Sequence, residues 1–138
     1  MKYLVDTDTF SLFLQVDVTV VANVIAHLSD GLLVSLITVQ EAWNGWATAI
    51  ARARTPDQLA LGHSRLAGTL NELRNWTVVP LSAAAIARYE RLKRQKLNVG
   101  GNDLRIAATA LELGATVVTR NRRDFARIPG VVLEDWSV

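Results

Sequence analysis

Four segments of the chain each place an acidic or amide side chain at the end of an apolar run. Asp6 directly follows the apolar residues 2–5, and Glu41 lies shortly after the run 32–37. Asp103 opens an alanine- and leucine-rich stretch, and Asn121 and Asp124 follow the run 116–119. Carboxylate and amide oxygens are the ligands that Mg²⁺ and Mn²⁺ prefer, and a divalent cation relieves the repulsion among neighbouring carboxylates. The pattern therefore indicates a site for a hard cation.

A metal held in this way supports hydrolysis of phosphodiesters. It activates a water and stabilises the charge that develops on the phosphate, and two metals clamp both reacting oxygens. Competing chemistries lack their residues. No Ser–His–Asp arrangement is evident, and Gly100-Gly101 lacks the lysine and the spacing of a P-loop. Because the chain has no cysteine and two histidines, a zinc site with nitrogen and sulfur ligands is not expected.

Each acid also has a simpler interpretation as part of a helix terminus. Asp6 and Asp8 are suited to capping a helix, and Glu41 forms a capping box with Thr38. A carboxylate such as Asp103 is favourable at a helix N-terminus. Asp6 fits this interpretation least well, because a carboxylate directly after a buried strand is costly without a partner. From the residues alone, both interpretations stay open.

The elements that must position these residues alternate between strands and helices. Capping residues and helical spacing separate five short apolar runs, which predict strands at residues 2–5, 32–37, 77–81, 116–119 and 131–133. Continuous apolar strands that alternate with helices predict an α/β domain whose parallel sheet is covered on both faces. Ligands of such sheets bind beyond the carboxyl ends of the strands, which is where the acids are expected to meet.

The composition predicts one folded domain over residues 1–138, because half of the residues are hydrophobic and a fifth are charged. Asp6 interrupts any signal-peptide core and no apolar run is long enough to span a membrane, so a cytoplasmic location is expected. The net charge is +2. The basic residues form two clusters that fit either a nucleic-acid contact or a solvated surface. They are Arg88, Arg91, Lys93, Arg94 and Lys96, and Arg120, Arg122, Arg123 and Arg127.

Four blocks of sequence and two closing motifs carry a resemblance that runs nearly from end to end. The blocks are YLVDTD at 3–8, SLITVQE at 35–41, GNDLRIAATA at 101–110 and VTRNRRDF at 118–125, followed by Ile128-Pro129-Gly130 and Asp135-Trp136. Any one block is a weak signal. In this order and at this chain length they resemble the PIN-domain ribonucleases, and more narrowly the VapC-type toxins of bacterial toxin–antitoxin pairs.

The resemblance implies a three-layer α/β/α fold with a five-stranded parallel sheet. It also implies an acidic site that coordinates one or two Mg²⁺ or Mn²⁺ ions and hydrolyses RNA phosphodiesters, as the toxin of a type II toxin–antitoxin pair. Asp6, Glu41 and Asp103 match the family's three well-defined acids, and the fourth position falls at Asn121 or Asp124. The implied partners are an RNA substrate, with transfer RNA among the structured RNAs that the family attacks, a cognate antitoxin, and a second copy in a homodimer.

Residues beside these acids gain expected roles as well. Thr7 and Thr119 carry hydroxyls suited to orienting the acids or a phosphate, or to capping. Asp8 stands where the family usually has Asn and adds a charge near the site. The basic residues that lie next to the site in sequence, and would hold RNA phosphates, are Arg120, Arg122 and Arg123.

Trp43 and Trp46 lie three positions apart on the helix predicted to carry Glu41, and so on one side of it. Core packing is the expected role, and the alternative is that one of them lines a hydrophobic groove for an antitoxin helix. Two other functions stay open. One is a PIN nuclease that is not a toxin and acts on RNA or DNA with the same acids. The other is a non-catalytic α/β binding module that binds no divalent metal.

Overall fold

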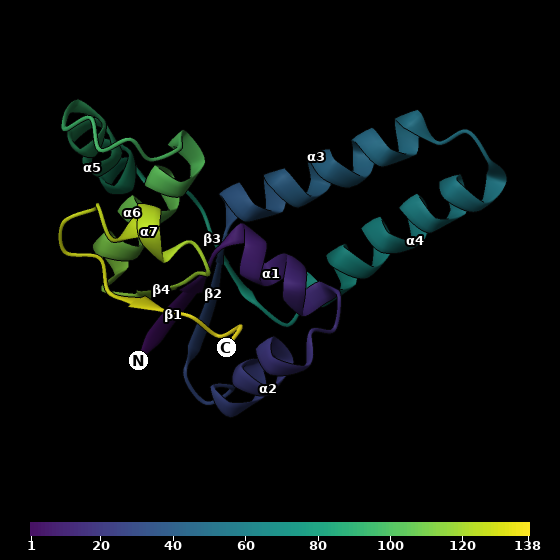
Figure 1. The fold of residues 1–138 in the computed structure, drawn as a ribbon, viewed down its shortest axis with the longest axis horizontal. Coiled ribbons are helices and arrows are strands. Elements are labelled where there is room, and N and C mark those ends of the chain that lie inside the picture. Colours follow the sequence, from purple (N-terminus) through teal and green to yellow (C-terminus); the bar gives the residue numbers. More distant parts are fainter.

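The computed structural model describes all residues from Met1 to Val138 and contains a five-stranded parallel sheet with helices on both faces (Figure 1). The strands are β1 (Lys2–Val5), β2 (Gly31–Ser35), β3 (Thr77–Val79), β4 (Thr116–Val118) and β5 (Leu133–Glu134). The helices are α1 (Thr7–Leu14), α2 (Val18–Ala26), α3 (Leu36–Arg52), α4 (Pro56–Leu73), α5 (Ala83–Arg94), α6 (Gly101–Leu113) and α7 (Arg122–Phe125). The strand order is β3-β2-β1-β4-β5, so the predicted α/β class and parallel sheet are confirmed.

The central strand β1 explains why the strand sequences are continuously apolar. Its side chains alternate between two buried faces. Leu4 packs in a core with residues of α5, α6 and α7, whereas Tyr3 and Val5 pack in a second core with residues of α1 and α2. Because β1 pairs with β2 on one side and β4 on the other, the order of the strands reverses beside it. Ligands of open α/β sheets bind at such a switch point, at the carboxyl ends of the strands.

Helices α3 and α4 pack against each other and project from the body of the molecule (Figure 1). The predicted start of α4 is confirmed, since the Thr55 hydroxyl accepts from the Gln58 N–H and Pro56 follows at the first helical position. Gly62 of α4 permits the close approach of the two helices. A Cβ at this position would lie 2.9 Å from Cγ1 of Ile50 on α3.

The start of α3 differs from the prediction. The Ser35 hydroxyl accepts the Ile37 N–H at 3.1 Å and caps the helix, so α3 begins at Leu36 and not after Thr38. The capping box of Thr38 and Glu41 is therefore wrong, and Glu41 lies beyond the first turn. No single helix is long and apolar enough to cross a membrane; α1 and α2 meet that measure only when joined across a bend of 104°.

Candidate active site

Asp6 directly follows the central strand β1 and is 4% exposed. Its backbone N–H donates to the Val118 carbonyl of β4 at 3.0 Å, which fixes the residue between two strand ends. One carboxylate oxygen accepts the Thr9 N–H at 2.8 Å and caps α1, so the capping role considered from the sequence is confirmed. Burial raises the pKa of Asp6, against the opposing effect of the Thr119 hydroxyl and the Thr9 N–H. Capping engages one of the two carboxylate oxygens of Asp6.

Asp103 lies in the first turn of α6, near the site residues predicted in the other segments. Burial raises its pKa, and the negative charges of Asp6, Glu41 and Asp124 raise the pKa further, in that order. The Asn121 side chain has the opposite effect on this pKa. All five predicted site residues therefore lie near one another at the carboxyl edge of the sheet.

Glu41 is oriented by hydroxyl groups. The Thr7 hydroxyl donates to Oε1 of Glu41 at 2.7 Å, and the Thr7 and Thr38 hydroxyl oxygens are 2.9 Å apart. This contact agrees with the orienting role expected for Thr7. The structure contains four ion pairs, and none of them involves Asp6, Glu41 or Asp103. Three acids thus share one region without a basic partner.

Asn121 and Asp124 form a connected pair. The Asn121 N–H donates to the Thr119 hydroxyl at 2.9 Å, and its side-chain Nδ2 donates to Oδ2 of Asp124 at 3.0 Å. The other oxygen of Asp124 accepts from Nη1 of Arg127 at 3.2 Å. Sequence reasoning placed Arg127 only in a general basic cluster. Its spacing of three residues from Asp124 is the one signal that indicated this contact.

The side chains of this edge fit a hard divalent cation by the chemistry of their donors. In this arrangement, no three acidic or histidine side chains converge closely enough to hold an ion directly. Mg²⁺, however, is usually bound through one or two carboxylates and keeps several waters. The atoms that these side chains offer as metal ligands are all oxygens. The raised pKa values of Asp6 and Asp103 reflect burial and repulsion between negative charges, which a cation would relieve.

The PIN domain family profile matches residues 3–131. The chain belongs to the PIN-domain family. Over 46 residues it is 46% identical to "Ribonuclease VapC2" of Rickettsia felis, and over 45 residues it is 49% identical to "tRNA(fMet)-specific endonuclease VapC" of Salmonella typhimurium. Each aligned segment covers 33% of this chain and 34% of the relative, so the chain spans about a third of these relatives' length.

Solved structures of VapBC complexes share the fold of this PIN domain over nearly its whole length. VapBC2 from Rickettsia felis, bound to a DNA fragment from its promoter, superposes with a TM-score of 0.81 at 25% identity and covers 99% of both chains. DNA-bound VapBC from Salmonella typhimurium gives a TM-score of 0.82 at 26% identity and covers 99% of this chain and 98% of that chain. The predicted resemblance to VapC-type proteins and the PIN-like fold are confirmed.

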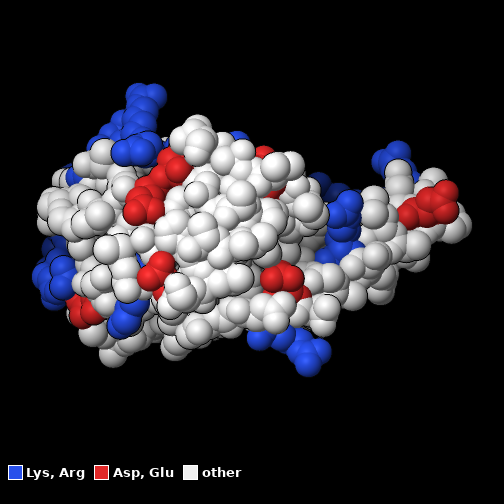
Figure 2. Space-filling model, turned by 90° about the horizontal axis from the view of Figure 1, so that it is seen from below, with Lys and Arg blue, Asp and Glu red and all other residues white.

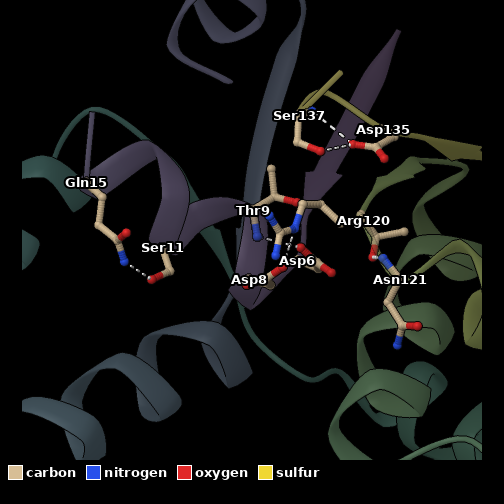
Figure 3. Close-up of polar contacts among 10 residues, drawn as sticks. Asp6, Asp8, Thr9, Ser11, Gln15, Arg120, Asn121, Asp135 and Ser137 are labelled. Atoms are coloured by element: carbon tan, nitrogen blue, oxygen red, sulfur yellow. Dashed lines mark hydrogen bonds and ion pairs between the residues drawn. The ribbon is translucent and has the colours of Figure 1, made fainter. Parts of the chain in front are cut away.

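The basic side chains predicted to contact RNA differ in whether they form ion pairs. Arg120 pairs with Asp8 at 2.9 Å (Figure 3), and both side chains are about half exposed to solvent. In the same view, Asp8 and the Arg120 side chain lie beside Asp6. Arg122 and Arg123 are exposed and form no ion pair. Figure 2 shows that the face seen from below carries scattered charges and no continuous basic patch.

A groove of about 1260 Å³ lies among α1, α3 and α4 of the PIN domain, and Glu41 lines it together with Phe13, Trp46 and Leu61. The expectation that Trp43 and Trp46 pack in the core is wrong. Trp43 is 48% exposed, and neither residue belongs to a buried cluster. The physical reason is that α3 leaves the sheet and projects with α4 (Figure 1), so its middle is not covered by the sheet, and Trp46 lines the groove.

Proposed function

We propose that this PIN domain is an endoribonuclease that hydrolyses RNA phosphodiesters with Mg²⁺ or Mn²⁺, as the toxin of a type II toxin–antitoxin pair. One observation carries the proposal. Asp6, Glu41 and Asp103 lie near one another at the switch point of the sheet, with no basic partner. Uncompensated carboxylates are costly to a fold, and a metal-dependent function gives them a use. The names of the VapC relatives agree with this chemistry.

The residues of the site take distinct roles in this proposal. Asp6 and Asp103 hold the ion, and Glu41 acts as a further ligand or as the base for the attacking water. Asn121 and Asp124 complete the outer shell. When bound, the ion supplies an activated water and stabilises the charge on the phosphate. Thr7 keeps the Glu41 carboxylate in one orientation through its 2.7 Å hydrogen bond.

The RNA contact follows from the exposed arginines. Arg122 and Arg123 are free to hold phosphates beside the acids, whereas Asp8 partly neutralises Arg120. We propose a structured RNA, with transfer RNA as the class to test first, because one relative is named a tRNA(fMet)-specific endonuclease.

The test is cleavage of a panel of transfer RNAs, other structured RNAs and DNA, with Mg²⁺, with Mn²⁺ and with a chelator. Wild type is compared with Asp6→Asn, which keeps an oxygen to cap α1. Metal-dependent RNA cleavage that is lost in the variant supports the proposal. Cleavage of DNA and RNA alike would favour a nuclease that is not a toxin. A wild-type chain that neither cleaves nor binds Mn²⁺ would favour the non-catalytic binding module.

We also propose that a cognate antitoxin occupies the groove among α1, α3 and α4, and that the chain forms a homodimer. The groove is apolar around Phe13, Trp46 and Leu61 and reaches Glu41, so an occupant would lie beside the acids. Trp46→Ala should weaken antitoxin binding by about 10-fold or more, as truncation of a buried aromatic anchor does. Trp43→Ala is the matched control, because Trp43 does not line the groove. Equal effects of both substitutions on antitoxin binding would contradict this placement. Light scattering of the chain tests the proposed homodimer.

A further inference from the structure

Arg127 is the one basic residue that forms an ion pair with an acid of the proposed metal site. Its Nη1 donates to Oδ1 of Asp124 at 3.2 Å and to the main-chain carbonyl of Asn98 at 2.9 Å. Asn98 lies between α5 and α6 and has a φ of 59°, in the left-handed region that few residues other than glycine adopt. One guanidinium nitrogen thus joins α7 to the segment that leads into α6 and Asp103.

The contacts of Asp124 extend this connection toward the acids. Its Oδ1 accepts from Arg127, and its Oδ2 accepts from the Asn121 amide at 3.0 Å. Asn121 is itself anchored, because its N–H donates to the hydroxyl of Thr119, which is fully buried. Both oxygens of Asp124 are therefore engaged by donors. The same contacts hold the amide of Asn121 where its hydrogen bonding lowers the pKa of Asp103.

We propose that Arg127 is a positioning residue, which holds Asp124 and Asn121 in a fixed arrangement with α6 and so sets the metal affinity of the site. The inference rests on the proposed metal-dependent function. Partners that orient metal ligands from the outer shell typically change metal affinity or activity by 10- to 100-fold when they are removed. Arg127 contacts no metal-binding oxygen of Asp6, Glu41 or Asp103, so it acts through Asp124.

Charge alone predicts the opposite effect of losing this arginine. A guanidinium beside a cation site repels the cation, so its removal should tighten metal binding. Loss of positioning should weaken metal binding, because Asp124 and Asn121 would then sample several orientations. The sign of the change in affinity therefore separates a positioning role from a bystander charge.

The experiment measures the affinity of the RNA-free chain for Mn²⁺ by electron paramagnetic resonance. The variants are Arg127→Ala, Arg127→Lys and the control Arg88→Ala, which removes a comparable arginine–carboxylate pair, with Glu112, outside the site. We expect Arg127→Ala to weaken binding by about 10-fold or more. Arg127→Lys, which keeps the charge but not the forked geometry, should fall between Arg127→Ala and wild type. Arg88→Ala should bind as wild type does.

A double substitution tests the route through Asp124. If Arg127 acts through this carboxylate, Asp124→Ala with Arg127→Ala should bind Mn²⁺ no more weakly than Asp124→Ala alone. Unchanged or tighter binding in folded Arg127→Ala would overturn the positioning role. Should that variant not melt cooperatively, wild-type affinity in Arg127→Lys would overturn it instead. Absence of Mn²⁺ binding in wild type would refute the proposed metal site itself, which is a distinguishable result.

Discussion

Mg²⁺ should raise the melting temperature of this chain, and Asp103→Asn should remove most of that gain. The pKa of Asp103 is raised by burial and then by the charges of Asp6, Glu41 and Asp124, so the metal-free site carries unrelieved repulsion. A cation that binds the folded state alone offsets the repulsion and shifts the folding equilibrium. Asparagine at position 103 keeps the size of the side chain and removes one of the charges that attract the ion.

The size of the effect follows from mass action and from the length of the chain. Ligand at tenfold its dissociation constant stabilises the folded state by about 1.4 kcal/mol. A chain of 138 residues has an unfolding entropy of about 0.29 kcal/mol/K near its melting temperature. The quotient of these values is a rise of about 5 °C at that Mg²⁺ concentration. In chelator, Asp103→Asn should melt no lower than wild type, because the substitution relieves repulsion.

Differential scanning calorimetry in chelator and in a Mg²⁺ series measures both quantities. Glu90→Gln is a suitable control, because Glu90 is an exposed acid on α5 with no ion pair. The control should keep the full Mg²⁺-dependent gain. An equal gain in Asp103→Asn and wild type would refute the reasoning, as would a chelated Asp103→Asn that melts several degrees below wild type.

Three further predictions concern pH, helix packing and RNA binding. The pKa of Asp103 is raised above 3.8 in the folded state, so the folded state binds this proton more tightly than the unfolded state does. In chelator, the stability of wild type relative to Asp103→Asn should therefore fall as pH rises from 3.8 through the folded pKa of Asp103, and thermal melts across pH measure this. Gly62→Ala should lower the stability of the fold by about 1–3 kcal/mol, because the added Cβ clashes with Ile50. Gly68→Ala has open space at its Cβ and should stabilise α4 by up to about 1 kcal/mol. Thermal melts that show lower stability for both variants would contradict this. Arg122→Ala should weaken RNA binding and reduce the slope of the logarithm of the binding constant against the logarithm of salt concentration by about 0.7. Fluorescence anisotropy in chelator measures this slope, and an unchanged slope would show that Arg122 does not contact the RNA.

Much of the fold and of the site followed from local signals in the sequence. Apolar runs indicated all five strands, most closely β1 and β4, which are buried on both faces, whereas the run 131–133 overlaps the edge strand β5 only at Leu133. Asp6 was identifiable as unusual, because a carboxylate directly after such a run needs a partner or a ligand. The parallel arrangement then placed Asp103 and the loop after β4 at the same edge as Asp6.

Other features depend on distant parts of the chain and could not be predicted. Ser35 and Thr38 are both good caps, and the structure uses Ser35, the last residue of β2. The exposure of Trp43 depends on α3 leaving the sheet, which no periodicity records. The role of Arg127 depends on a carbonyl 29 residues earlier in the chain, at Asn98.

The most direct test of the central claim is the single-turnover rate at which wild type and Asp103→Asn cleave one structured RNA, at saturating Mg²⁺ and after chelation. We predict cleavage by wild type with Mg²⁺, none after chelation, recovery when Mg²⁺ is restored, and none by folded Asp103→Asn. Cleavage by Asp103→Asn at a rate close to that of wild type, or wild-type cleavage that survives chelation, would contradict a metal site built on these acids.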